Sequence, residues 1–539
     1  MPPARSHLIL LLHAHLPYVR HPEQAEFFEE CWFFEAVLEC YLPILGVLDG
    51  WERDDIPGGL ALSLSPTLVA MLRDDLLTQR LHRHLSQLLD LAAREELRAH
   101  FLPERRAIAT GHRIRLEALV QQLQRLPNGI PAAFARHAAA GRVELLTCPA
   151  THPTLPLLLE EPGAVRTQLR TALDSHREVF GQAPAGLWLP ECAWVPGLDR
   201  HLSEHGIRWT VLESHGLLHA TPRPRGAVYA PVRTRSGLAC FGRDPGSARQ
   251  VWSRHGGYPG DPRYREFHRD VAHEADWDYV QPYLHGASER GFTGLKFYRI
   301  TGPGPAKELY DRTAALAAVH QHAAHFVEAR ARVAREAAGC MTSPPVIVAP
   351  YDAELFGHWW FEGPEFLDAV VRRLAEDRDG IRLSLPSRLL EALPDLQLVE
   401  PAASTWGEGG HFGVWLDPAN AWMEAPVRGA GRRLAALASR LATGNPSALS
   451  ERRMRQATRE LLLAQASDWP FLVKMGSAGT YPATRFREHV AAVHHLADQV
   501  EADAPERSDD SLQDLERRHP VFPHLEWRNL ASTAESGWR

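Results

Sequence analysis

Residues 186–196 read GLWLPECAWVP, and this stretch decides which fold class we expect. The segment 185–189 is short and apolar and follows a turn with Gly and Pro, which is typical of a buried strand. Pro190 cannot donate a hydrogen bond to a sheet, so we expect the strand to end there. Glu191 comes directly after that end, where α/β barrels carry their active sites. A glutamate between two tryptophans suits chemistry on a sugar ring, although it can equally cap the next helix.

A second stretch, residues 344–363, reads PPVIVAPYDAELFGHWWFEG and repeats this pattern. Its β-branched run 345–349 predicts an inner strand that ends at Pro350 and Tyr351, with Asp352 just beyond. Cleavage of a glycosidic bond needs two carboxyl groups, one to attack or activate and one to donate and recover a proton. Two strand ends that each carry a carboxylate among aromatic residues therefore predict such a site. Two unrelated acids are the alternative.

The composition limits the class of partner. The 539 residues exceed the usual length of one domain, and 45% are hydrophobic and 23% charged. With 59 basic and 66 acidic residues the net charge is −7, so we expect neither a nucleic acid nor an anionic membrane as partner. The six cysteines are scattered without a CxxC pair, which argues against a disulfide scaffold and fits a reducing compartment.

The N-terminal apolar run, residues 8–12, predicts the first barrel strand. It is too short for a signal peptide and no cleavage site of small residues follows it. No apolar run approaches the roughly 20 residues that a membrane-spanning helix needs. We therefore expect a cytoplasmic protein.

His13 and His15 follow that first strand and lie on the same side of an extended segment. Such an HxH pair binds a metal in some barrels, whereas in others the imidazoles bond to substrate hydroxyls. We favour the sugar-binding role because no early aspartate nearby completes a metal set. Glu144 and His152 are further candidates for the cleft, and both can equally be structural.

The remaining text predicts a catalytic region over residues 1–395 and a helical domain over 396–505. Within the first region, residues 71–135 are expected to form a helical insertion. Residues 221–264 are rich in Gly, Pro and Arg, and we expect them to form a long lid loop. The second has helices at 425–442, 449–467 and 483–502, with a non-helical elbow at 468–477. Residues 506–539 are a charged, partly disordered tail.

At this point the motifs match a known family. The chain resembles glycoside hydrolase family 57, and within it the 1,4-α-glucan branching members, over about residues 7–500. The matching segments are HAHLPY at 13–18, GRVELLTCPATHPTLPLL at 141–158, WLPECAW at 188–194, APYDAELFGHWWFEGPEF at 349–366 and the region 404–480.

The resemblance implies a (β/α)7 barrel with an inserted helical region, followed by an all-α C-terminal domain. It implies that Glu191 is the nucleophile and Asp352 the general acid/base. Ser477 stands where relatives often have a glutamine, and the lid tyrosine of branching members has no counterpart between Tyr229 and Tyr258. Taken together with the residue-based candidates, the expected substrate-binding residues are His13, His15, His152, Arg269, Gly286, Trp277, Trp406, Trp415, Asp468 and Ser477.

The resulting hypothesis is a retaining transglycosylase that cleaves α-1,4 and forms α-1,6 glucosidic bonds through a covalent glycosyl-enzyme. Burial of Asp352 among Tyr351, Trp359 and Trp360 is expected to favour the protonated carboxyl that the first step needs. The chemistry requires no metal and no organic cofactor. We expect α-1,4-glucan donor and acceptor chains as partners and a monomer or small homo-oligomer.

Three other readings stay open on the sequence alone. The nearest is a family 57 α-amylase or 4-α-glucanotransferase, which uses the same carboxylates with water or a 4-hydroxyl as acceptor. The second is a metal-dependent carbohydrate deacetylase, suggested by the HxH pair. The third is a glycan-binding protein without catalysis.

Overall fold

The structure of the chain is a computed structural model, which describes residues 6–253, 256–287, 289–302, 304, 306–376, 380–393, 395–503 and 510–531. By its internal contacts the chain forms two compact units. The first unit comprises residues 1–62, 71–144 and 244–389, and the second comprises residues 63–70, 145–243 and 390–539. Each unit is thus assembled from several stretches of chain. The predicted division into consecutive domains at residues 395 and 505 stays a prediction.

The first sheet is centred on the N-terminal strand. Its order is β3–β2–β1–β7, and β8 also pairs with β1. Strands β7 and β8 both run parallel to β1, in which only the first residue is not buried. A parallel strand covered on both faces must be apolar throughout, which is why the run LILLL forms it. The bounds are β1 His7–Ala14, β2 Leu60–Leu64, β3 Val143–Leu146, β7 Val346–Asp352 and β8 Arg382–Leu383.

Strand β7 continues past the point where we expected it to end. It runs through Pro350 and Tyr351 to Asp352, which pairs with His13. The amide of Asp244 donates to Val348 O, so the backbone polar groups of Val348 point away from β1. Pro350 lies two residues further along the strand and its backbone points the same way. Its missing N–H therefore removes no hydrogen bond to β1.

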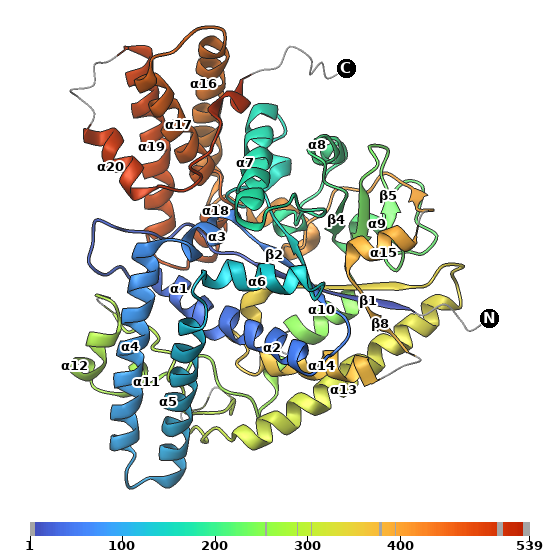
Figure 1. Ribbon diagram of the computed structural model, residues 1–539, viewed down its shortest axis with the longest axis vertical. Coiled ribbons are helices and arrows are strands. Elements are labelled where there is room, and N and C mark those ends of the chain that lie inside the picture. The colour runs from blue at the N-terminus through green and yellow to red at the C-terminus, as the bar shows by residue number, and fades with distance from the viewer. Residues whose placement is uncertain are drawn as a thin grey trace. The chain divides into compact units, whose positions relative to one another are not determined.

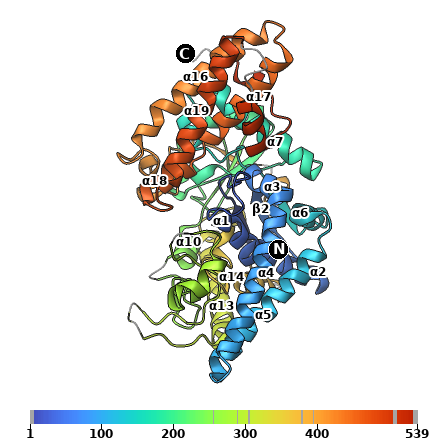
Figure 2. The same cartoon turned by 90° about the vertical axis from the view of Figure 1, so that its left-hand side faces the viewer.

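Helices make up most of the first unit. Figures 1 and 2 both show α4 and α5 side by side as a hairpin, and this confirms the helices predicted between residues 71 and 125. Asp74 caps α4 by accepting a bond from the Leu77 N–H, and Pro103 stands at the start of α5, where its missing N–H is harmless. The helices of this unit are α1 Glu30–Glu35, α2 Leu42–Arg53, α4 Asp75–Arg98, α5 Pro103–Gln124, α6 Gly129–Ala139, α10 Pro245–Trp252, α11 Val271–Glu274, α12 Trp277–Val280, α13 Arg312–Ala338, α14 Gly363–Glu376 and α15 Pro386–Ala392, which extends past the unit's last residue.

A π-helix, η1 (Ala36–Tyr41), joins α1 to α2. The continuous helical stretch Glu30–Arg53 is long and apolar enough to cross a membrane by length and composition, contrary to our expectation that no segment would be. However, 72% of its apolar window is buried inside the protein, as in the core helix of a soluble domain.

The second unit contains a smaller sheet of order β4–β6–β5–β9. The predicted strand 185–189 is not a regular strand, because only Gly186 and Leu187 form isolated parallel bridges, to Trp209 and Thr147. A Cβ on Gly186 would lie 2.3 Å from the Trp209 ring, so this close approach requires glycine. The strands are β4 Trp209–Leu212, β5 Val232–Arg233, β6 Ala239–Gly242 and β9 Gln397–Leu398. The expected irregular loop at 221–264 is therefore wrong where β5, β6 and α10 lie.

The three predicted C-terminal helices are confirmed as α16, α17 and α19, which pack together in Figure 2. The predicted elbow is wrong: residues 468–475 form α18, because Pro470 stands in the first turn and is tolerated there. The described part of the tail, 510–531, is also ordered and buries several apolar side chains; residues 504–509 and 532–539 lie outside the described part. The helices are α3 Pro66–Leu72, which runs on into the first unit, α7 Pro162–Phe180, α8 Leu198–Glu204, α9 Ser214–Leu218, α16 Glu424–Ala442, α17 Ala448–Ala464, α18 Asp468–Met475, α19 Tyr481–Glu501 and α20 Asp510–Arg518.

Candidate active site

Glu191 lies in a tight turn of the second unit, the 3-10 helix Pro190–Cys192. Both Glu191 (φ 63°) and Cys192 (φ 48°) adopt left-handed backbone conformations. Such conformations cost about 1–3 kcal/mol each in residues other than glycine and collect at functional sites. The turn that follows the predicted strand end is thus a strained one, held in place by the surrounding chain.

The segment around Trp406 and the residue before α18 hold Glu191. The Trp406 amide donates to Glu191 O (2.9 Å), and its indole Nε1 donates to Glu191 Oε2 (2.8 Å). Ser467 Oγ donates to the other carboxylate oxygen, Oε1, at 3.4 Å. Because the single hydroxyl proton of Ser467 is used in this way, His152 Nδ1, 2.9 Å from Ser467 Oγ, is the donor to that oxygen. Each carboxylate oxygen therefore has its own donor.

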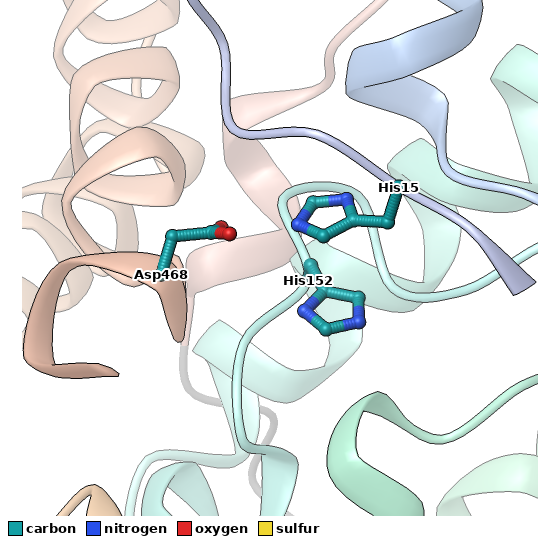
Figure 3. Close-up of side chains that lie close together, drawn as sticks. All are labelled: His15, His152 and Asp468. Carbon is teal, nitrogen blue, oxygen red and sulfur yellow. The ribbon is translucent and has the colours of Figure 1, made fainter. Parts of the chain in front are cut away.

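His152 and Asp468 lie beside each other in the second unit. Figure 3 shows both side chains, and the nearest ring nitrogen and carboxylate oxygen are within 4.8 Å of each other. His152 is buried and has a left-handed backbone (φ 58°), whereas Asp468 is partly exposed at the first position of α18. His15, also drawn in Figure 3, belongs to the first unit. The second unit therefore joins Glu191, His152, Trp406 and Asp468 in one cluster.

Asp352 lies at the end of β7 in the first unit, in register with His13 at the end of β1. The rings of His13 and His15 stack with centroids 5.9 Å apart, which confirms that the two point to the same side. Burial and the neighbouring His15 hold the pKa of His13 well below its usual value, so this imidazole is neutral. A neutral imidazole can either donate to or accept from a hydroxyl.

The π-helix η1 holds the loop that follows Asp352. Cys40 Sγ donates to Ala353 O (2.9 Å), and the Tyr41 hydroxyl donates to Glu354 Oε1. At Gly357, which has φ 116°, a Cβ would lie 1.8 Å from Glu39 O, so the loop and the π-helix touch backbone to backbone. Short π-helical segments within α-helices shift the helical register locally and are frequent at functional sites.

A charged network extends from the same π-helix. His358 Nδ1 lies 2.6 Å from Glu39 Oε2. Burial alone would raise the pKa of Glu39, but the bond and the charge of His358 lower it to about 2. Burial would lower the pKa of His358, yet Glu39 raises it above its usual value. One turn earlier, burial raises the pKa of Glu35 to about 7.

The other predicted contacts have different surroundings. In the first unit, Arg269 forms an ion pair with Glu274, Arg290 lies 5.9 Å from the Trp277 ring centroid, and Gly286 is exposed with φ 72°. In the second unit, Trp415 is buried against Gly407, and Ser477 is exposed just after α18. Arg269, Trp277 and Gly286 thus belong to the first unit, and Trp415 and Ser477 to the second.

Two expectations near the site change. Trp359, which we expected to help bury Asp352, is itself 56% exposed, whereas Tyr351 and Trp360 are buried as expected. Glu144 accepts bonds from both the amide and the hydroxyl of Ser387, at the start of α15, which gives it a structural role.

Some residues of the site escaped sequence reasoning. Ser467 and Tyr41 are ordinary residue types whose roles depend on partners more than 270 positions away in the chain. The only local signal for Ser467 was its position directly before Asp468. Nothing local separated Tyr41 from the apolar residues of the same helix.

The described residues offer two further clusters of metal-ligand types: Asp49, Glu52 and His137 of the first unit, which lie partly at the surface, and the buried Glu460, His489 and His519 of the second unit. We consider the buried cluster. Here hydrogen bonds account for the contacts, since the Nδ1 atoms of His489 and His519 lie 2.6 and 2.7 Å from the Glu460 carboxylate. Arg485 donates to His519 Nε2, which fixes that ring as a donor to Glu460. We assign this cluster to the packing of the C-terminal segment.

Comparison with known proteins places the chain in a family. The family model for glycosyl hydrolase family 57 matches residues 9–281, and the model for the C-terminal domain of 1,4-alpha-glucan branching enzyme matches residues 427–529. A 1,4-alpha-glucan branching enzyme of Thermococcus kodakarensis is 31% identical over 531 residues, covering 92% of this chain and 74% of the relative.

Solved structures agree with this placement. The alpha-amylase AmyC of Thermotoga maritima is 34% identical with a TM-score of 0.91, covering 98% of this chain and 100% of that one. The family 57 branching enzyme of Pyrococcus horikoshii is 28% identical with a TM-score of 0.88, covering 99% and 98%. The predicted fold class, an α/β barrel followed by helices, is thereby confirmed. The chain belongs to glycosyl hydrolase family 57.

Proposed function

We propose that this protein is a 1,4-α-glucan branching enzyme. The observation that carries the proposal is the match of residues 427–529 to the branching-enzyme C-terminal domain, on a chain whose N-terminal half is of family 57. The helices α16, α17 and α19 that form this region are well packed, and the buried Glu460 cluster ties the described tail to them.

In the proposed mechanism, Glu191 attacks the anomeric carbon of an α-1,4-glucan while Asp352 protonates the departing oxygen. Two donors, the Trp406 indole and the Ser467 hydroxyl, orient the Glu191 carboxylate and stabilise its charge. Asp352, once deprotonated, takes the proton of the incoming 6-hydroxyl as that oxygen displaces Glu191. Two inversions at one carbon retain the α configuration, and the new bond is α-1,6.

The acceptor decides the product. A glucan 6-hydroxyl gives a branch, a 4-hydroxyl gives redistributed linear chains, and water gives hydrolysis. Similarity to the Thermotoga maritima alpha-amylase favours hydrolysis as the second candidate function. Both candidates use the same two carboxylates, so they differ in what holds the acceptor and excludes water.

Proton NMR of amylose after incubation with the protein tests the proposal. Wild type is expected to create an α-1,6 anomeric signal with little rise in reducing ends, and Glu191→Gln is expected to create neither. Trp422→Phe serves as a control, since Trp422 is not among the expected site residues and its indole donates to the backbone of Ala419. It should create the same α-1,6 signal as wild type.

Two results would contradict the proposal. Reducing ends that rise without an α-1,6 signal would assign an α-amylase, and an α-1,6 signal that persists in Glu191→Gln would remove Glu191 from the mechanism. Insensitivity to EDTA is a further expectation, because we assign no metal. The same proposal includes a cytoplasmic location, where its six cysteines would stay reduced.

A further inference from the structure

Trp359 is the most exposed tryptophan among the described residues. Its exposed fraction is 56%, against 38% for Trp252 and 37% for Trp422. A single exposed apolar residue is common and by itself indicates nothing. The ring of Trp359 combines this exposure with a fixed orientation and lies close in the chain to Asp352.

Two contacts fix the ring. Phe267 lies under the indole with ring centroids 4.6 Å apart and an interplanar angle of 30°. The Trp359 amide donates to Glu354 O at 3.2 Å, which anchors the backbone to the loop that follows Asp352. Phe267 is itself backed by Phe292 and by the buried ammonium group of Lys296. One face of the indole is therefore packed, and the exposed area belongs to the rest of the ring.

A hydrogen-bond donor, His358, lies next to the Trp359 ring. The imidazole of His358 lies edge-on with its centroid 5.0 Å from that of Trp359. Its Nδ1 is bonded to Glu39, and since Glu39 raises its pKa, Nε2 also carries a proton over a wider pH range. A pyranose presents an apolar C–H face to an aromatic ring and hydroxyls around its rim, so an anchored indole beside a charged donor matches it.

The same loop carries the candidate acid/base. Trp359 lies seven residues after Asp352, and the π-helix η1 holds the intervening loop through Cys40, Tyr41 and Glu39. We propose that Trp359, backed by Phe267, is a stacking platform for a glucose unit of the α-glucan chain. It adds a candidate to the expected sugar-binding tryptophans Trp277, Trp406 and Trp415, and it rests on the proposed function only for the class of sugar.

The test measures binding of maltoheptaose by isothermal titration calorimetry in the Glu191→Gln background, where no turnover occurs. Trp359→Ala is expected to weaken the affinity at least fivefold, and Trp359→Phe to restore most of it, because a phenyl ring can still stack. Trp252→Ala removes another half-exposed tryptophan of the same unit and should leave the affinity unchanged. Circular dichroism of each variant checks that the fold is intact.

The outcomes separate this inference from the proposed function. Unchanged affinity in Trp359→Ala overturns the platform, and equal losses in the Phe and Ala variants overturn stacking as its basis. If wild type forms no α-1,6 bonds but Trp359→Ala still weakens the affinity for maltoheptaose, the branching assignment fails and the platform stands. If wild type branches and Trp359→Ala binds normally, the platform fails and the assignment stands.

Discussion

The two segments that carry the candidate carboxylates look alike in sequence and are built differently. Asp352 ends a regular seven-residue strand, in register with β1 throughout. Glu191 follows two isolated bridges and lies in a left-handed turn. Both segments are apolar runs followed by a proline and an acid, so the pattern predicts a carboxylate at the end of an extended segment and leaves the backbone there undetermined.

The two carboxylates also differ in what holds them. Glu191 is held directly, by an indole N–H, a hydroxyl and the backbone of Trp406. The loop that follows Asp352 is held by charged and hydrogen-bonded contacts with η1. We therefore expect damage to the support of Glu191 to lower mainly the rate of the chemical step, and damage to η1 to lower mainly stability, with a smaller loss of kcat.

The largest expected effect comes from removing the carboxylates themselves. Glu191→Ala and Asp352→Ala should each lower the rate of α-1,6 bond formation by about 1,000-fold or more, since general acid–base catalysis alone contributes about 10²–10⁴. With α-maltosyl fluoride and azide, the roles separate. Asp352→Ala should give the α-azide, because azide attacks the glycosyl-enzyme and needs no base. Glu191→Ala should give the β-azide, because azide replaces the nucleophile. The product anomers are read by NMR, and a shared anomer would overturn the assignment of roles.

The next largest effect is on the free energy of unfolding, when the Glu39–His358 ion pair beside the Asp352 loop is broken. Glu39→Gln breaks a buried ion pair and should lower the free energy of unfolding by about 3 kcal/mol. Glu39, with its pKa lowered to about 2, stabilises the fold above pH 4.5, and this is lost as the pH falls towards 2. His358, with its pKa raised, stabilises below pH 6.5, and this is lost as the pH rises through that raised pKa. The deficit of the variant should therefore be greatest between about pH 4.5 and 6.5.

Urea unfolding followed by near-UV circular dichroism from pH 4 to 9 measures this deficit. Glu35→Gln, one turn away, is the matched control with the opposite sign. Because burial raises the pKa of Glu35 to about 7, this carboxyl destabilises the fold increasingly as the pH rises from 4.5 to 7. Its replacement should stabilise the protein over that range. A deficit in Glu39→Gln that does not vary with pH would rule out the ion pair as its cause.

A smaller effect is expected in the Glu191 support. Trp406→Phe keeps an aromatic ring beside Trp188 but removes the bond to Glu191 Oε2. A hydrogen bond to a charged group contributes roughly 1.5–3 kcal/mol, so kcat/KM should fall about 10- to 100-fold. Trp422→Phe also removes an indole bond, but to the backbone of Ala419, and should change kcat/KM by less than twofold. Equal losses in the two variants would show that Trp406 acts only through packing.

Much of the architecture follows from local pattern. The apolar strand β1, the β-branched strand β7 and the long helices α4, α5, α16, α17 and α19 match their predictions because their periodicity covers many residues. Helix α18 escaped because a proline three residues into a short segment resembles a breaker. The tail escaped because charge dominates its composition, while the apolar residues that dock it (Val521, Phe522, Leu525, Trp527 and Leu530) are few.

The candidate site was predictable to a lesser extent. The motif residues Glu191, His152, Trp406 and Asp468 do meet in the second unit, and His13 does pair with Asp352 in the first. The residues that hold them in place could not be predicted from the sequence in the same way. The hydrogen bonds of Ser467 and Tyr41 join residues that are far apart in the chain and come close only in the folded protein. The π-helix η1 also shifts the helical register away from the 3.6-residue period that a sequence prediction assumes.

The smallest expected effect tests that hidden support. Tyr41→Phe removes the hydroxyl that donates to Glu354 and should lower kcat about fivefold, for a bond worth about 1 kcal/mol, with KM unchanged. Burial already raises the pKa of Glu354, and the Tyr41 bond opposes that rise, so its loss favours the neutral carboxyl and loosens the loop. Tyr310→Phe is the matched control, since Tyr310 donates to Glu362 in the same unit. If both variants lost kcat equally in steady-state assays, the effect would belong to the whole unit. A loss confined to Tyr41→Phe would mean that the π-helix positions the loop of Asp352 by individual bonds, the counterpart of what Trp406 does for Glu191.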